Sequence, residues 1–293
     1  MSCGAEVGQQ GVHFRVWAPE RTSVEVVIEP PQAQEIMLRA EDDGYWSALV
    51  PGLAAGARYR FRIDGKEPLL PDPFSRFQPE GPHGPSEVVD PSVFRWSDTE
   101  WKGVSIKGQV IYEMHVGTFS PSGTWAGATE KLKHLRELGV TVLQVMPVAE
   151  FPGKFGWGYD GVDLFAPYHV YGAPDDFRRF VDEAHKLDLA VILDVVYNHF
   201  GPDGNYLERY SSQYFADRET EWGRAINYDG RGARGPRTLV TDNAAYWISE
   251  YHLDGLRLDA TQCIFDESDD YLVAALTRSA RAAAGNRQIV IVA

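Results

Sequence analysis

An arginine and an aspartate two residues apart are the side chains of this sequence best suited to chemistry. They are Arg257 and Asp259, within residues 253–260. The run alternates as a short strand does, which places both side chains on one face and Leu256 and Leu258 on the other. A neighbouring cation favours an ionised carboxylate, and an ionised carboxylate held at a strand end is what a nucleophile requires. A purely structural ion pair is the alternative, and the spacing alone leaves it open.

A second strand about sixty residues upstream ends in similar side chains. Residues 189–194 are an apolar run that ends in Asp194, and Asn198 and His199 follow in the next loop. This pattern places three polar side chains at the mouth of a sheet. Strand-end and loop capping is the alternative role for Asp194 and Asn198.

Together the segments DVVYNH (194–199) and GLRLDA (255–260) resemble two signature segments of the α-amylase clan of glycoside hydrolases. The resemblance implies that Asp259 is the nucleophile and that Arg257 orients it. It also implies that Asp194 and His199 shape the sugar subsite at the cleaved bond. Asn198 would hold the loop, and its equivalent binds calcium in some members. A single oxygen donor does not make a calcium site, so we assign no metal ligand and no cofactor, and calcium dependence stays open at this point.

An aromatic, glycine-rich loop at residues 155–161, FGWGYDG, offers flat faces to a sugar ring. It resembles the WGY segment of the same clan, in which the equivalent of Tyr159 stacks on the sugar at the cleavage site. Trp157 either does the same or packs the loop. For His115 and Phe119, which follow the first predicted strand, we expect a packing role.

The elements that would position these residues alternate between strand and helix. Strands are expected at 110–115, 141–146, 189–194, 253–259 and 288–293, and helices around 124–139, 175–187, 244–251 and 272–279. A long loop is expected from Asp194 to about Leu239. Such alternation predicts parallel βαβ units and, with polar residues after each strand, the mouth of a TIM (β/α)8 barrel. A doubly wound sheet is disfavoured, because no glycine fingerprint follows the first strand.

Residues 12–64 alternate without a helical period and predict a small antiparallel β-sandwich. They resemble the immunoglobulin-like, carbohydrate-binding type of N-terminal domain in isoamylases and glycogen branching enzymes. Trp17 and Trp46 are candidates for sugar stacking, although a core role is commoner. The predicted fold class is therefore multidomain: a sandwich over 1–95, a linker over 96–108, and the first five strands of a barrel over 109–293.

Composition narrows the classes of function. The 293 residues carry 42 acidic and 28 basic side chains, a net charge of −14, which argues against nucleic acid or an anionic membrane as partner. The two cysteines, Cys3 in an expected frayed terminus and Cys263, predict no disulfide framework. Neither a secretory signal nor an 18-residue apolar run is present, so we expect a cytoplasmic protein.

The leading hypothesis is an α-glucan hydrolase. The proline-rich connector PDPFSRFQPEGPHGPSEVVDP (71–91) resembles that of maltooligosyltrehalose hydrolases, which cut the α-1,4 bond next to a terminal trehalose. This implies maltooligosyltrehalose as substrate and maltooligosyltrehalose synthase as pathway neighbour. The clan's general acid, a glutamate ending the fifth strand, would lie just beyond Ala293, so we expect a segment of a longer enzyme. The alternatives are a glycogen branching or debranching enzyme and, for a chain ending at Ala293, a non-catalytic glucan-binding protein.

Overall fold

The N-terminal part of the chain folds into two antiparallel sheets. The computed structural model describes residues 3–293. One sheet has the order β1-β2-β6-β5 and the other β4-β3-β7-β8, with β9 paired to β7. The bounds are β1 Gly4–Gly8, β2 Gly11–Trp17, β3 Val24–Ile28, β4 Gln34–Met37, β5 Arg39–Ala40, β6 Tyr45–Pro51, β7 Arg58–Ile63, β8 Lys66–Leu70 and β9 Ser86–Glu87. Alternate residues face inward, and Phe14 of β2 meets Tyr59 of β7 with ring centroids 4.8 Å apart. The sequence prediction of an antiparallel sandwich is confirmed.

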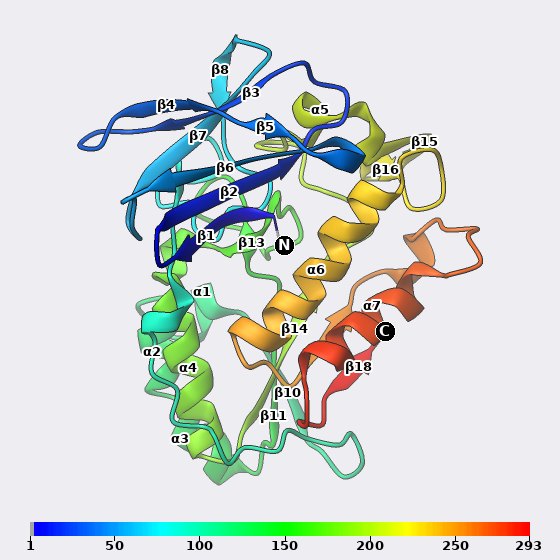
Figure 1. Ribbon diagram of the computed structural model, residues 1–293. Helices are drawn as coiled ribbons and strands as arrows, with labels where there is room; N and C mark the ends of the chain where they lie inside the picture. The colour runs from blue at the N-terminus through cyan, green and yellow to red at the C-terminus, as the bar shows by residue number, and fades with distance from the viewer. Residues whose placement is uncertain (1–2) are drawn as a thin grey trace.

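The second part is a parallel sheet with the strand order β10-β11-β14-β17-β18. All four neighbouring pairs are parallel, as βαβ units require. The strands are β10 Ile111–Met114, β11 Val142–Val145, β14 Ala190–Val195, β17 Gly255–Leu258 and β18 Val290–Val292. The helices that connect them are α1 Val116–Phe119, α2 Trp125–Thr129, α3 Leu132–Leu138, α4 Pro174–Lys186, α6 Arg234–Glu250 and α7 Leu272–Ala283. In Figure 1 the sandwich lies above this sheet, and α6 runs diagonally from beside the sandwich down toward the sheet.

Two sequence expectations in this region are corrected. The helix expected over 124–139 is two helices, α2 and α3, which separate at Glu130 and Lys131, where Lys131 has φ of −95° and ψ of −10°. The loop expected up to about Leu239 is largely structured. It holds α5 (Leu207–Tyr210) and the hairpin β15 (Phe215–Thr220) and β16 (Gly223–Ile226), and α6 already begins at Arg234. The remaining strands, β12 (Ala149–Glu150) and β13 (Asp163–Pro167), form a separate antiparallel pair.

The sandwich and the parallel sheet share a buried interface. Trp17 at the end of β2 meets Tyr214 edge-on, with centroids 5.0 Å apart, and covers the start of α6. A Cβ at Gly235 of α6 would lie 2.3 Å from the Trp17 ring, so glycine is required for this close approach. Phe74 of the connector packs on Phe165 of β13 at 5.2 Å. Trp17 is only 4% exposed, so it belongs to the core and is not available to stack on a sugar.

The segment predicted as an ordered or semi-rigid linker covers the amino ends of the parallel strands. Asp98 accepts hydrogen bonds from His185 of α4 and from His252, at 2.8 and 2.9 Å. Trp101 donates to Asp254 at 2.6 Å and stacks on the His185 ring. Residues 96–104 are thus fixed against the sheet by polar contacts with residues far away in the sequence.

The amino-terminal end of the described chain is also ordered. Cys3, which the sequence placed in a frayed terminus, is 2% exposed beside strand β1, and burial raises the pKa of its thiol to about 12. Both cysteines are free, in line with the prediction of no disulfide framework. Among the helices of residues 3–293, none combines the length and the apolarity needed to cross a bilayer.

Candidate active site

Strand pairing brings the two predicted strand-end carboxylates together. Asp194 of β14 is the register partner of Arg257 in β17, and the backbone amide of Asp259 donates to the Val195 carbonyl at 3.0 Å. Residues opposite each other in paired strands point to the same face. Leu256 and Leu258 are buried at 1% and 2%, so the predicted alternation of β17 is confirmed.

A single guanidinium nitrogen connects the two carboxylates. Nη1 of Arg257 donates to both carboxylate oxygens of Asp194, at 3.0 and 2.9 Å, and to Oδ1 of Asp259 at 2.6 Å. The Asp194 side chain is fully buried, whereas that of Asp259 is 19% exposed. The partly exposed carboxylate is therefore held in place while one side stays open to a ligand. Immediately after it, Ala260 adopts a left-handed conformation with φ of 42° and turns the chain away.

Asp194 is supported by a second donor from the aromatic loop. The Tyr159 hydroxyl donates to Oδ2 of Asp194 at 3.0 Å. Burial raises the pKa of Asp194 to about 6, Arg257 and Tyr159 oppose this rise, and the charge of Asp259 adds to it. Burial and the charge of Asp194 in turn raise the pKa of Tyr159, so its hydroxyl stays protonated and donates.

Two glycines allow the aromatic loop to reach this position. A Cβ on Gly158, whose φ is 94°, would lie 2.0 Å from the Pro147 carbonyl oxygen. A Cβ on Gly201 would lie equally close to the Asp160 carbonyl oxygen, and the Gly201 amide donates to the Gly161 carbonyl at 3.1 Å. The loops after β11 and β14 thus touch backbone to backbone, which places Tyr159 over the end of β14.

His115 supports the other side of the aromatic loop. Its Nε2 lies 2.9 Å from the Gly156 carbonyl oxygen and 3.0 Å from the Tyr171 hydroxyl. His115 therefore fastens the loop, as the expected packing role requires, and Phe119 packs edge-on against Tyr112. Trp157 is 73% exposed and Phe155 is 95% exposed, so this loop presents two aromatic faces to solvent.

The predicted residues after β14 are buried beside the site, and some of their polar side-chain atoms have no hydrogen-bond partner within residues 3–293. Asn198 is 3% exposed, and neither its Oδ1 nor its Nδ2 has a hydrogen-bond partner within residues 3–293. The same holds for Nδ1 of His199, which is 7% exposed. Burial lowers the pKa of His199, so the ring is neutral near pH 7. Buried polar atoms without protein partners are suited to hydrogen-bond a ligand hydroxyl or water.

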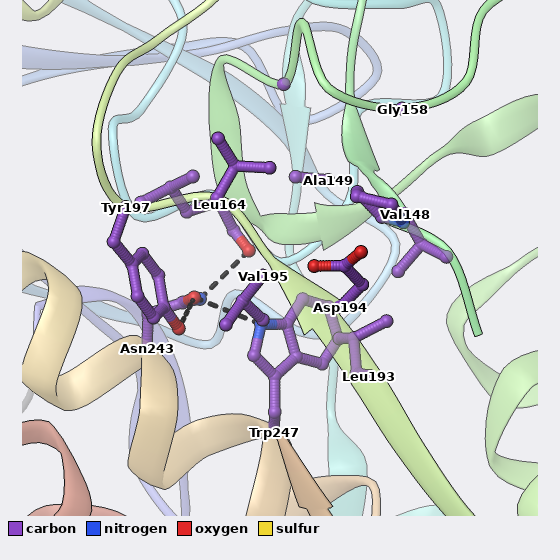
Figure 2. Close-up of a pocket in the computed structure, with 13 residues that line it drawn as sticks. Val148, Ala149, Gly158, Leu164, Leu193, Asp194, Val195, Tyr197, Asn243 and Trp247 are labelled. Carbon is purple, nitrogen blue, oxygen red and sulfur yellow. Dashed lines mark hydrogen bonds between the residues drawn. The ribbon is translucent and has the colours of Figure 1, made fainter. Parts of the chain in front are cut away.

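The sequence reasoning missed two residues around this site. Trp222, at the tip of the hairpin β15–β16, stacks on His199 with centroids 5.5 Å apart and is 46% exposed. Asn243 of α6 lies behind β14, where its side chain accepts from Tyr197 and Trp247 and donates to the Leu164 carbonyl, at 2.8, 3.0 and 2.9 Å (Figure 2). Asn243 and Asp194 line a cavity of about 20 Å³, room for one water.

The arrangement is organised for carboxylate chemistry. Among residues 3–293, no group of three or more His, Cys, Asp or Glu side chains is arranged to hold a metal ion. What the site offers is a partly exposed carboxylate oriented by a guanidinium, a buried carboxylate beside it, and aromatic faces from two loops. A carboxylate held in this way can attack an electrophilic carbon.

Comparisons with known proteins agree with this geometry. Residues 70–240 match the family model "Alpha amylase, catalytic domain", and residues 2–75 match "Carbohydrate-binding module 48 (Isoamylase N-terminal domain)". A malto-oligosyltrehalose trehalohydrolase of Deinococcus radiodurans is 46% identical over 92% of this chain and 44% of its own length. The one from Saccharolobus solfataricus is 44% identical over 93% of this chain and 48% of its own length. The chain thus spans about half the length of these relatives.

A solved structure shares the whole described fold. A Salmonella typhimurium protein described as an alpha amylase superposes with a TM-score of 0.92 at 43% identity, over 99% of this chain and 49% of that one. The resemblance inferred from DVVYNH and GLRLDA is therefore confirmed.

Proposed function

The chain belongs to the α-amylase catalytic-domain family, and from that premise we propose that it carries the nucleophile of a retaining glycoside hydrolase. The observation behind this proposal is the single Arg257 nitrogen that holds both Asp194 and Asp259 at the ends of neighbouring strands. It leaves Asp259 oriented, partly exposed and beside a buried carboxylate.

In the proposed mechanism an Asp259 oxygen attacks the anomeric carbon of the sugar. The carbon–oxygen bond to the departing sugar breaks as this bond forms, and the departing oxygen takes a proton from a carboxylic acid about 5–5.5 Å from the nucleophile. Water then attacks the same carbon, gives a proton to the carboxylate left by that acid, and breaks the bond to Asp259. Asp194 and His199 would bind the ring hydroxyls, Tyr159 and Trp157 would stack on sugar rings, and Asn198 would position the loop.

The barrel assignment forms part of the same proposal. We assign β10, β11, β14, β17 and β18 to the first five strands of a (β/α)8 barrel, with the sandwich at 1–95, the linker at 96–108 and the barrel portion at 109–293. The protonating glutamate would follow the fifth strand, in the portion of the relatives that this chain does not match.

For the substrate we propose maltooligosyltrehalose, cleaved at the α-1,4 bond next to its terminal trehalose. The support is the connector at 71–91 together with relatives that are malto-oligosyltrehalose trehalohydrolases. The reaction consumes the product of a maltooligosyltrehalose synthase, which would be its pathway neighbour. Two free thiols, Cys3 and Cys263, support a reducing, cytoplasmic location.

The decisive experiment is product analysis with the chain extended to the length of its relatives. Maltooligosyltrehalose should yield free trehalose, and Asp259→Asn should reduce kcat on the order of 10⁴-fold while the melting temperature is unchanged. New branch points in amylose without trehalose would instead assign a branching enzyme. Near-wild-type turnover by the Asn variant would refute Asp259 as nucleophile.

A further inference from the structure

A turn of the sandwich contacts the segment that leads into the hairpin β15–β16. The turn joins β2 to β3 and carries Glu20, whose carboxylate accepts hydrogen bonds from two consecutive serines. The donors are the Ser211 hydroxyl at 2.9 Å and the amide and hydroxyl of Ser212 at 2.7 and 3.0 Å. Burial tends to raise the pKa of Glu20, but these hydrogen bonds lower it, so the side chain is ionised near neutral pH. Hydrogen bonds to an ionised acceptor are stronger than those between neutral groups.

Arg21, the next residue, contacts the helix on the other side of Ser211. Its Nε donates to the Tyr210 carbonyl and its Nη2 to the Glu208 carbonyl, both at 3.1 Å. Both carbonyls belong to α5, and carbonyls in the last turn of a helix have no donor within the helix. Glu20 and Arg21 therefore bind opposite backbone groups at the junction between α5 and the residues before β15. In Figure 1, α5 lies beside the sandwich.

The turn that presents these two side chains is itself fixed. Oδ1 of Asp64, one residue beyond β7, accepts from the amides of Thr22 and Ser23 at 2.7 and 3.2 Å. The Arg21 amide donates to the Ala18 carbonyl at 3.2 Å and closes the turn. Because the turn is bound to the sandwich in this way, its side chains hold the contacted segment at a defined place on the sandwich.

The hairpin β15–β16 depends on its base for its position. It forms a sheet of two strands, and a two-stranded hairpin alone is marginally stable in water. Side chains 217–219 of β15 are exposed. The base is closed by the Asn227 amide, which donates to the Tyr214 carbonyl at 3.0 Å, two residues after Ser212. Strand β15 has six residues and spans about 20 Å, so a rotation of about 5° at the base would displace the tip by roughly 2 Å.

The tip of the hairpin carries an aromatic face of the candidate site. Trp222 stacks on His199, and its amide donates to the Thr220 hydroxyl at 3.1 Å. A gap of about 1 Å already removes up to half of a dispersion contact. A tip displaced by roughly 2 Å would therefore lose this stacking. Trp222 keeps its place over His199 because the base of the hairpin is held.

Other contacts keep the hairpin folded in the absence of Glu20. Trp17 meets Tyr214 at the base with centroids 5.0 Å apart, and the Arg218 guanidinium lies 4.5 Å over the Phe265 ring. These contacts remain when the carboxylate is removed. Truncation at Glu20 should therefore loosen the hairpin without unfolding the protein.

We propose that Glu20 and Arg21 of the sandwich are positioning residues for the substrate site, because they hold the base of the hairpin that places Trp222 against His199. The proposal rests on the proposed function for the identity of the substrate. It gives the sandwich a part in substrate binding that needs no contact between the sandwich and a sugar. Since Trp222 lies beside the carboxylates and not among them, the loss should appear in KM and not in kcat.

The test uses the chain extended to the length of its relatives. Glu20→Ala and Arg21→Met remove the two contacts singly, and Glu20→Ala is also made in a Trp222→Ala background. Glu41→Ala is the matched control, because Glu41 is an exposed carboxylate of the same sandwich that is hydrogen-bonded to Arg15 at 2.9 Å. The measurements are steady-state kinetics with maltooligosyltrehalose, the melting temperature, and hydrogen–deuterium exchange of peptides covering 215–226 and 255–258.

We expect Glu20→Ala and Arg21→Met to raise KM about two- to fivefold with kcat changed less than about twofold, and Glu41→Ala to change neither. In the Trp222→Ala background, Glu20→Ala should change KM by less than about 1.5-fold, because the side chain that it positions is already gone. Amides of 215–226 should exchange at least about threefold faster in Glu20→Ala, with those of 255–258 and the melting temperature unchanged.

An unchanged KM in Glu20→Ala would overturn the proposal. An equal rise of KM in the Trp222→Ala background would show that Glu20 acts by another route, and would overturn it too. A lower melting temperature with faster exchange at 255–258 would assign Glu20 a general structural role instead. If the extended wild-type chain releases no trehalose, the proposed substrate fails, and the exchange of 215–226 in Glu20→Ala and Glu41→Ala decides the positioning role by itself.

Discussion

The buried histidine beneath the parallel sheet offers the sharpest test of how the fold is held together. His185 of α4 lies between two carboxylates, with Nδ1 2.8 Å from Asp98 and Nε2 2.9 Å from Asp254. All three side chains are at most 3% exposed. Replacing His185 by Leu keeps an apolar body under Trp101 but leaves two buried carboxylates without their shared cation. We expect the variant to be markedly less stable.

The size of the expected loss of stability follows from the burial of His185 and its two carboxylate partners. Removing one partner of a buried ion pair costs about 3–5 kcal/mol, because the remaining charge stays desolvated. At about 2–4 °C per kcal/mol, the melting temperature should fall by roughly 6–20 °C. His134→Leu on the exposed side of α3 is the matched control, and an exposed substitution of this kind should change stability by less than about 0.5 kcal/mol.

The loss of stability in His185→Leu should also depend on pH, and it should be larger at low pH than at high pH. Burial disfavours the His185 imidazolium, but the hydrogen bonds to Asp254 and Asp98 outweigh it and raise the pKa of His185 above 6.5. The contribution of His185 to the free energy of unfolding is therefore complete below pH 6.5. It is lost as the pH rises through the raised pKa of His185 in the folded protein. Burial tends to raise the pKa of Asp98, but His185 and His252 lower it well below its usual range. The contribution of Asp98 to stability is therefore lost only in strong acid.

Denaturant unfolding of wild type, His185→Leu and His134→Leu from pH 5 to 9 measures both effects. The difference between wild type and His185→Leu should be largest near pH 5–6 and should shrink toward pH 9. A loss below 1 kcal/mol at pH 6, or a difference that does not vary with pH, would refute the description of His185 as a buried imidazolium between two carboxylates.

Three further predictions concern the site and the interface. In the extended chain, Tyr159→Phe removes a hydrogen bond that favours ionised Asp194. The acid limb of the kcat/KM profile, expected near pH 6, should therefore move to higher pH. A pH–rate profile whose acid limb stays in place or moves to lower pH would contradict this. Trp222→Ala should raise KM for maltooligosyltrehalose about two- to tenfold through loss of an aromatic face worth about 0.5–1.5 kcal/mol, and steady-state kinetics with unchanged KM would exclude the role. Gly235→Ala should destabilise by about 1–3 kcal/mol in thermal unfolding, because its Cβ would lie 2.3 Å from the Trp17 ring, and the double variant with Trp17→Ala should lose less than the sum of the two single effects.

Residues with a strand period were the most predictable part of the candidate site. Asp194, Arg257 and Asp259 each follow from two-residue alternation and from the rule that parallel strands end at one edge, and the structure places them in hydrogen-bonding contact. Tyr159 could not be placed by period, because it lies in a turn. It was found through resemblance, and its contact with Asp194 depends on the close backbone approach at Gly158 and Gly201.

Residues whose partners are distant in sequence were the least predictable. Trp222 lies in a polar stretch without periodicity, and only the pairing of β15 with β16 carries it to His199. Segment 96–104 was predicted as part of a linker, but its contacts, such as that of Asp98 with His185, 87 positions away, could not be predicted from local sequence. Cys3 was wrongly placed in a frayed terminus, because pairing of β1 with β2 covers it. In each case a tertiary contact supplies what local sequence lacks.

Helix α6 links these observations, because each of its faces contacts a different part of the molecule. Gly235 packs against Trp17 of the sandwich, Asn243 accepts a hydrogen bond from Tyr197 just after β14, and Glu250 lines a cleft together with Glu6 of β1. The chain then turns at Tyr251 and His252 and enters β17 within three residues, where Arg257 and Asp259 lie. Since interiors are close-packed and transmit strain, a shift of α6 relative to the sandwich must be absorbed by the Asn243 contacts or passed to β17. The sandwich therefore packs directly on the helix that leads into the strand carrying Arg257 and Asp259.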